Sequence, residues 1–224
     1  MTSNATRCLP WRLYAILDRA ALADRDPVVV ASAAIRGGAD AIQWRDKQAS
    51  SAQLIEDAAR LLPLTQAAGI PLIINDRPDV AQTVGAHGVH LGQEDMPLKD
   101  ARALLGPGRL IGKSTHSLDQ ALAAEAEGAD YIGLGPIFPT PTKPDYGSVG
   151  LPPVGEVMLR LRVPVVCIGG IEPANVQQVL GAGGRCIAVV RAVCAAPNPE
   201  EATRTLKQTV AACLLRNVAP PHLH

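Results

Sequence analysis

Short apolar runs alternate with longer segments rich in Ala, Leu, Glu and Gln along nearly the whole chain. The short runs predict buried parallel strands, because they are brief, β-branched and bounded by turn residues. The longer segments favour helix. The predicted strands are Leu13 to Leu17, Ala41 to Trp44, Leu72 to Asn75, Gly88 to Leu91, Leu110 to Lys113, Tyr131 to Leu134, Val165 to Ile168 and Ile187 to Val190. The predicted helices include Ser51 to Ala68, Leu118 to Glu127, Ala174 to Leu180 and Glu200 to Leu215.

The joints before the strands repeat a Gly-Ala pair, as in Gly38-Ala39-Asp40 and Gly128-Ala129-Asp130. Glycine suits the left-handed residue that ends a helix. About eight such units of roughly 28 residues predict an α/β fold, a single-domain (β/α)8 TIM barrel. An open doubly wound sheet is the alternative, disfavoured because no G-x-G-x-x-G turn follows the first strand. We expect the barrel to span residues 11–216, between flexible segments at 1–10 and 217–224.

Composition narrows the partners. The chain has 224 residues, with 21 basic and 21 acidic side chains, so we expect no nucleic-acid partner, because such binding needs an excess of Lys and Arg. No apolar window is long enough to cross a membrane, and the first residues lack a secretory signal. We therefore expect a cytoplasmic protein without a membrane partner. Five cysteines form no C-x-x-C pair, and Cys167 and Cys186, which lie inside apolar runs, are expected to act as small hydrophobes.

In a barrel, functional residues lie at the carboxyl ends of the strands. After the second strand, Gln43, Arg45 and Lys47 share one face, because alternate strand residues point the same way. Two cations and an amide in a barrel mouth would meet an anion. The alternative is a frayed strand end with solvated charges.

Two carboxylates follow the next strands. Asp76 ends the third strand and Asp95 follows the fourth. Such a pair is typical of Mg²⁺ sites, because this cation prefers oxygen ligands and keeps positions for water and phosphate oxygens. The alternative is a helix cap at each position, before Arg77-Pro78 and Met96-Pro97.

The fifth strand is followed by Ser114 and His116, which we expect to face the barrel mouth. His116 is a candidate general acid or base. Ser117 has Gln three residues later, so we interpret it as a helix cap. His87 and His90, near the fourth strand, are interpreted as core histidines.

The last loops offer phosphate ligands. The long loop after the sixth strand carries Thr140, Thr142 and Lys143, whose hydroxyls and ammonium suit phosphate oxygens. Gly169-Gly170 follows the seventh strand and Arg191 the eighth. Backbone N–H groups at such turns form phosphate sites. The residues therefore predict two anion sites, one for Mg²⁺-bound pyrophosphate and one for a monophosphate, and the displacement of pyrophosphate by a phosphorylated acceptor.

Five segments together resemble the motifs of the thiamine phosphate synthase family, and they follow in order over most of the chain. They are Gln43-Trp44-Arg45-Asp46-Lys47, Ile74-Asn75-Asp76-Arg77, Gly88 to Asp95, Gly133 to Lys143 and Ile168-Gly169-Gly170-Ile171. The resemblance implies a (β/α)8 barrel that joins a hydroxymethylpyrimidine pyrophosphate to a thiazole phosphate and releases pyrophosphate with Mg²⁺.

The resemblance also implies roles, carried over residue by residue. Small-molecule substrates are the expected partners, and the oligomeric state is left open, a homo-oligomer included. The pyrimidine pyrophosphate would contact Gln43, Trp44, Arg45, Asp46, Lys47, Asn75, Ser114 and Lys143, of which Arg45, Lys47, Ser114 and Lys143 would be catalytic. Mg²⁺ would bind Asp76 and Asp95, and the thiazole phosphate Thr140, Pro141, Thr142, Gly170, Val190 and Arg191.

One position departs from the family pattern, which commonly has Ser where this chain has Arg191. The family mechanism is described as dissociative, with pyrophosphate leaving before the thiazole nitrogen attacks. Two alternatives remain. A thiazole tautomerase relative has a segment similar to Ser114-Thr115-His116-Ser117, but it lacks the pyrophosphate residues. A non-catalytic barrel that binds thiamine precursors would be expected to lose a metal carboxylate or Lys143.

Overall fold

The computed structural model describes residues 9–140 and 147–218. Eight parallel strands form a closed barrel in the order in which they occur in the sequence. β8 pairs with β1, with Leu13 beside Ile187, and this pairing completes the ring. The strands are β1 (Leu13–Asp18), β2 (Ala41–Arg45), β3 (Leu72–Asn75), β4 (Gly88–Leu91), β5 (Leu110–Thr115), β6 (Tyr131–Leu134), β7 (Val165–Ile168) and β8 (Cys186–Val189). The predicted (β/α)8 barrel is confirmed, and the open sheet is wrong.

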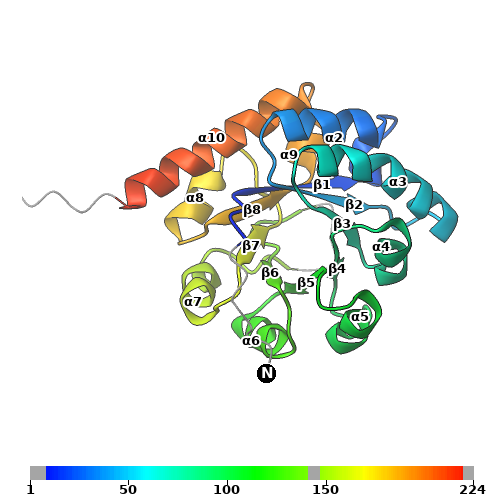
Figure 1. Ribbon diagram of the computed structural model, residues 1–224. Helices are drawn as coiled ribbons and strands as arrows, with labels where there is room; N and C mark the ends of the chain where they lie inside the picture. The colour runs from blue at the N-terminus through cyan, green and yellow to red at the C-terminus, as the bar shows by residue number, and fades with distance from the viewer. Residues whose placement is uncertain (1–8, 141–146, 219–224) are drawn as a thin grey trace, which may run out of the picture.

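Helices surround the barrel, as Figure 1 shows. α10 packs against α2 and α8 and continues beyond the barrel wall (Figure 1). The helices are α1 (Arg19–Leu22), α2 (Pro27–Arg36), α3 (Ser51–Ala67), α4 (Pro78–Val84), α5 (Leu98–Leu105), α6 (Leu118–Ala126), α7 (Pro152–Arg160), α8 (Val176–Gly181), α9 (Arg191–Cys194) and α10 (Pro199–Val218).

The predicted element boundaries hold to within a few residues. β8 begins one residue earlier than predicted and α8 begins two residues later, at Val176. In the turn before α8, the Oδ1 of Asn175 accepts from the N–H of Glu172 at 2.9 Å. α10 extends to Val218, two residues into the segment predicted to be a tail, and residues 219–224 lie outside the described residues.

The repeated Gly-Ala-Asp joints connect neighbouring strands at their amino ends. Gly38 adopts a φ of +97°, which glycine reaches without a steric penalty. The carboxylate of Asp40 then accepts from the backbone N–H groups of Arg12 and Leu13, at 2.7 and 2.9 Å. Asp130 accepts from Ile111 in the same way, at 2.8 Å. Each joint therefore ties one strand to the start of its neighbour.

Alternation along the strands divides the core into two layers. Leu13, Ala15 and Leu17 point outward and pack under the helices. Tyr14 and Ile16 point into the barrel, where they join a smaller interior cluster. Within the described residues, no helix is long and apolar enough to span a membrane.

Candidate active site

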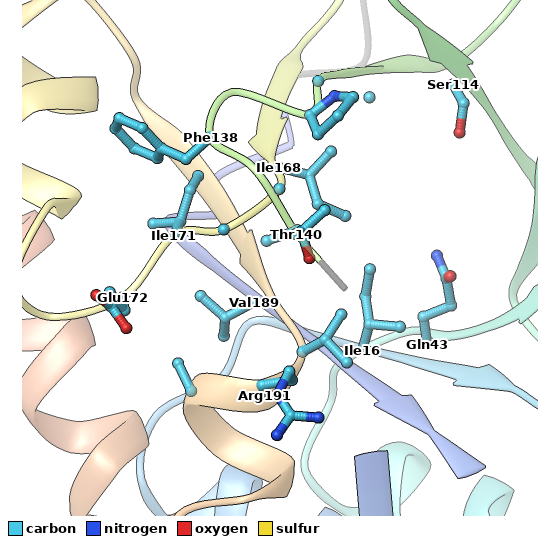
Figure 2. A pocket seen from close by; sticks show the side chains of 18 of the residues that line it. Ile16, Gln43, Ser114, Phe138, Thr140, Ile168, Ile171, Glu172, Val189 and Arg191 are labelled. Carbon is cyan, nitrogen blue, oxygen red and sulfur yellow. The ribbon is translucent and has the colours of Figure 1, made fainter. Parts of the chain in front are cut away.

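A cavity of about 410 Å³ opens at the carboxyl ends of the strands. Figure 2 shows Gln43 and Ser114 on one side of it, facing the same space, with Phe138 and Ile171 on the other side. The predicted site residues that line it are Gln43, Arg45, Asn75, Ser114, Thr140, Gly170, Val190 and Arg191. The barrel therefore brings together residues that lie far apart in the sequence.

Arg45 lines this cavity from the end of β2 and forms an ion pair with Asp18, the last residue of β1. Asp18 is only 3% exposed, so this charge pair is largely removed from water. The pair holds one guanidinium nitrogen in place, while the planar group keeps other donors for an anion. Sequence reasoning missed Asp18, because the predicted strand ended at Leu17. The available signal was an acidic residue at the end of a barrel strand.

Lys47, Asp76 and Asp95 form a second charged group at this end of the barrel. The Nζ of Lys47 lies 2.9 Å from the Oδ2 of Asp76. Burial raises the pKa of Asp95, and its hydrogen bond with Asp76 raises it further. Burial also disfavours the charged form of Asp76, but hydrogen bonds with Asp95 and Lys47 outweigh it, so the pKa of Asp76 is lowered. Of the two carboxyls, Asp95 therefore holds a proton more readily than Asp76.

The backbone around these carboxylates rules out the helix-cap alternatives. Arg77, not Asp76, precedes α4, and Pro97 precedes α5. Asp95 instead accepts from the N–H of Gly92 at 2.6 Å, within its own loop. Asp76 has a φ of +62°, which is rare for a residue with a side chain and typical of functional sites.

The carboxylate pair fits a hard divalent cation. Asp76 and Asp95 are in hydrogen-bond contact, and their oxygens repel each other when both carboxyls are ionised. A cation bound between them would relieve this repulsion. No group of three or more His, Cys, Asp or Glu suited to a metal occurs in the described part of the chain. Two protein carboxylates with water and phosphate oxygens are a common arrangement for Mg²⁺.

Ser114 and the nearby histidines have defined partners. The Oγ of Ser114 lies 2.9 Å from the Nε2 of His90. His116 also lines the cavity, but its Nδ1 contacts the backbone oxygen of Gly135. The Nδ1 of His87 accepts from the N–H of Leu72 at 3.0 Å, but the residue is half-buried and is not part of the core. His90, also interpreted as a core residue, lines the cavity instead.

Ser117 caps α6, as predicted, by accepting from the N–H of Gln120 at 3.2 Å. The Gln120 side chain does not return to Ser117. Its Oε1 accepts from the N–H of His116 at 2.7 Å. The helix start therefore holds the loop that carries His116.

The loops after β6 and β7 are joined at the far side of the cavity. The N–H of Phe138 donates to the oxygen of Gly169 at 3.0 Å. Gly170 has a φ of +61°, and a Cβ there would lie 2.6 Å from the oxygen of Pro139. Glycine is therefore required for this close approach of two backbones. α9 begins beside these loops at Arg191, whose side chain is exposed.

Two predicted contact residues lie elsewhere. The side chain of Trp44 is fully buried in the layer between strands and helices, under the guanidinium of Arg19, whose Cζ lies 5.0 Å from the ring centroid. Asp46 accepts from the N–H groups of Gln48 and Ala49 at 2.9 and 3.1 Å. Both side chains support the loop after β2. Pro141, Thr142 and Lys143 lie outside the described residues.

Taken together, fold and site define an enzyme class. A (β/α)8 barrel with glycine-rich loops after β7 and with cations and carboxylates in its mouth is typical of phosphate-handling TIM-barrel enzymes. The family model described as thiamine monophosphate synthase matches residues 13–193. The chain belongs to the thiamine monophosphate synthase family, and it is an enzyme of the transferase class.

Individual relatives agree with this assignment. The thiamine-phosphate synthase of Chloroflexus aurantiacus is 48% identical over 201 residues, which cover 89% of this chain and 93% of the relative. That of Roseiflexus castenholzii is 47% identical over 195 residues, or 87% of this chain and 86% of the relative. The solved thiamine phosphate pyrophosphorylase of Pyrococcus furiosus has a TM-score of 0.85 and 39% identity, and the match covers 92% of this chain and 98% of that one.

Proposed function

We propose that this enzyme joins 4-amino-2-methyl-5-(diphosphooxymethyl)pyrimidine to 4-methyl-5-(2-phosphoethyl)thiazole, or its carboxylated form. The products are thiamine phosphate and pyrophosphate, together with carbon dioxide when the acceptor is the carboxylated form. The names of the relatives support this reaction. The observation that carries the proposal for this chain is the arrangement of Arg45 and the Lys47–Asp76–Asp95 group at one end of the barrel.

The pyrophosphate is assigned to the side of the cavity near β2 and β3. Arg45 and Lys47 supply positive charge there, and the family resemblance assigns Lys143 to the same anion. Asp76 and Asp95 would hold Mg²⁺. When bound, this cation would neutralise the negative charge that develops on the leaving pyrophosphate. The positively charged side chains stabilise the same negative charge on the pyrophosphate through charge-assisted hydrogen bonds.

The pyrimidine ring is assigned to the polar residues between these charges and the barrel floor. Gln43, Asn75 and Ser114 line the cavity and offer amide and hydroxyl groups to a nitrogen heterocycle. Trp44 and Asp46 have side chains engaged outside the cavity, so we assign them no direct contact. They support the loop that carries Arg45 and Lys47.

The thiazole phosphate is assigned to the opposite side. Gly170 and the start of α9 at Val190 and Arg191 line the cavity there, and they present backbone N–H groups beside a helix start. Thr140 approaches from the loop after β6 (Figure 2). Pro141 and Thr142 complete the proposed set.

The reaction then follows a dissociative course. The bond between the pyrimidine methylene carbon and the pyrophosphate oxygen breaks, and both electrons leave with pyrophosphate. The lone pair of the thiazole nitrogen next forms the bond to the methylene cation. No proton leaves the nitrogen, so this step needs no general base. The chain contributes leaving-group stabilisation and the alignment of two bound reactants, each of which accelerates such reactions by orders of magnitude.

One incubation tests this function. Purified protein is mixed with both phosphorylated substrates, with and without Mg²⁺, and thiamine phosphate is monitored. We expect product that requires both substrates and Mg²⁺. Conversion of a thiazole phosphate alone would favour the tautomerase alternative. Binding of either precursor without any turnover would favour the non-catalytic barrel.

A further inference from the structure

A chain of hydrogen bonds crosses the interior of the barrel beneath the cavity. The Nε2 of Gln43 donates to the hydroxyl of Tyr14 at 2.8 Å. The hydroxyls of Tyr14 and Tyr131 lie 3.1 Å apart. The Tyr131 hydroxyl lies 3.1 Å from the Nδ1 of His90, whose Nε2 lies 2.9 Å from the Oγ of Ser114. Three residues therefore connect Gln43 to Ser114, and both of these end residues line the cavity.

The side chains of this hydrogen-bond chain are enclosed in the interior of the barrel. Tyr14 and Tyr131 are 1% and 0% exposed, and the ring of Trp11 makes T-shaped contacts with both of their rings. A Cβ at Gly112 would lie 2.2 Å from the Cζ of Tyr131 and 2.5 Å from the Nδ1 of His90. Only glycine at this strand position leaves room for the two rings.

Burial fixes the protonation of the tyrosines. It raises the pKa of Tyr14 and of Tyr131 above the ordinary value for a phenol, so each keeps its single hydroxyl hydrogen. A buried hydroxyl hydrogen without an acceptor destabilises the fold. The hydrogen bonds of this chain must therefore all run in the same direction.

The Gln43 amide sets this direction, because its Nε2 faces the hydroxyl of Tyr14. Tyr14 accepts from the Nε2 of Gln43, so its own hydrogen goes to Tyr131. Tyr131 then donates to the Nδ1 of His90, which must be neutral and carry its proton on Nε2. That N–H donates to the Oγ of Ser114. Ser114 keeps its hydrogen, and Gln43 its carbonyl oxygen, for the cavity.

We propose that Tyr14, Tyr131 and His90 are positioning residues, which fix Gln43 as a hydrogen-bond acceptor and Ser114 as a donor toward the substrate. This inference rests on the proposed function. A 4-aminopyrimidine offers the complementary pair, because its exocyclic amine donates and the adjacent ring nitrogen accepts. The corresponding 4-oxopyrimidine reverses both, since its carbonyl accepts and its ring N–H donates. This chain of hydrogen bonds thus sets the specificity of the enzyme for the 4-amino form of the pyrimidine.

The test compares the pyrophosphates of the 4-amino and 4-oxo pyrimidines as substrates. The ratio of their kcat/KM values is measured for the wild type, Tyr14→Phe and Tyr131→Phe. Either change breaks the chain, so Gln43 and Ser114 can reverse their roles. We expect the preference for the amino form to fall by about tenfold or more, with little change in KM for the thiazole phosphate.

Trp11→Phe is the matched control. It disturbs the packing around the same two rings but removes no hydroxyl. We expect it to keep the wild-type preference for the amino form. An equal loss of preference in Trp11→Phe, or an unchanged preference in both tyrosine variants, would overturn the proposal.

A second measurement needs no variant and no turnover. Nitrogen NMR of the ¹⁵N-histidine-labelled wild type identifies the tautomer of each of the 5 histidines. We expect His90 to carry its proton on Nε2, and a proton on its Nδ1 would contradict the proposed direction. Absence of thiamine phosphate formation by the wild type would instead refute the proposed function and leave this result standing.

Discussion

The Nζ of Lys47 lies 2.9 Å from the Oδ2 of Asp76, across the ends of β2 and β3. This contact joins a cation of the proposed pyrophosphate site to a carboxylate of the proposed metal site. The contact with Lys47 also favours the ionised form of Asp76, which burial disfavours. We expect Lys47 to exchange this carboxylate for a phosphate oxygen when Mg²⁺ and pyrophosphate bind.

Asp76→Asn should lower turnover and raise the Mg²⁺ concentration needed for half-maximal activity. The amide keeps the shape of the side chain but loses the charge that attracts the cation. A steady-state assay across a range of Mg²⁺ concentrations measures both effects. Unchanged Mg²⁺ dependence would count against Asp76 as a ligand.

Arg45→Ala should reduce kcat/KM by about 10- to 150-fold, because a charge-assisted contact contributes about 1.5–3 kcal/mol. Lys143→Ala should have an effect of similar size. Arg36→Ala is a suitable control, since Arg36 is exposed and pairs with Glu200 between α2 and α10, at 2.8 Å. Wild-type rates in both test variants would refute the assignment of the leaving-group site.

Arg191→Ser tests the position where the chain departs from the family pattern. Arg191 begins α9 and lines the cavity, so we expect its guanidinium to reach the proposed phosphate site. We expect KM for the thiazole phosphate to rise several-fold, with KM for the pyrimidine pyrophosphate unchanged. Equal KM values in both enzymes would show that only the backbone N–H at this position matters.

Acid should destabilise the fold through His87. Burial, helped by the positive charge of Arg109, lowers the pKa of His87 below its ordinary value of 6.5. The unfolded chain therefore binds a proton more readily than the folded one, and the free energy of unfolding falls as the pH drops below about 6.5. Urea unfolding at a series of pH values measures this slope. His87→Asn, which can still accept from Leu72, should flatten it.

The sequence predicted the barrel and most strand ends because each unit carries its own local signals. Alternation placed Gln43 and Arg45 on the inner face, and the structure confirms this. The same alternation puts Trp44, which lies between these two residues, on the opposite face, yet the family resemblance added it to the contact set. The local pattern was the better guide to this side chain.

Contacts between strands could not be predicted in the same way. The pairing of Arg45 with Asp18 depends on the register of β1 and β2. The hydrogen bond between Tyr14 and Tyr131 spans 117 residues and exists only because the barrel closes. Neither residue stands out in the sequence, since a tyrosine in an apolar strand is an ordinary core residue.

Calorimetric titration with pyrophosphate tests the central claim most directly. Pyrophosphate is added to the wild type and to Asp76→Asn, with and without Mg²⁺, and thiazole phosphate is titrated in parallel. The account predicts that Mg²⁺ strengthens pyrophosphate binding to the wild type by about tenfold or more. We expect a far smaller effect of Mg²⁺ on pyrophosphate binding to Asp76→Asn. Thiazole phosphate should bind both proteins equally. Pyrophosphate binding that is indifferent to Mg²⁺, or equally strong in Asp76→Asn, would contradict it.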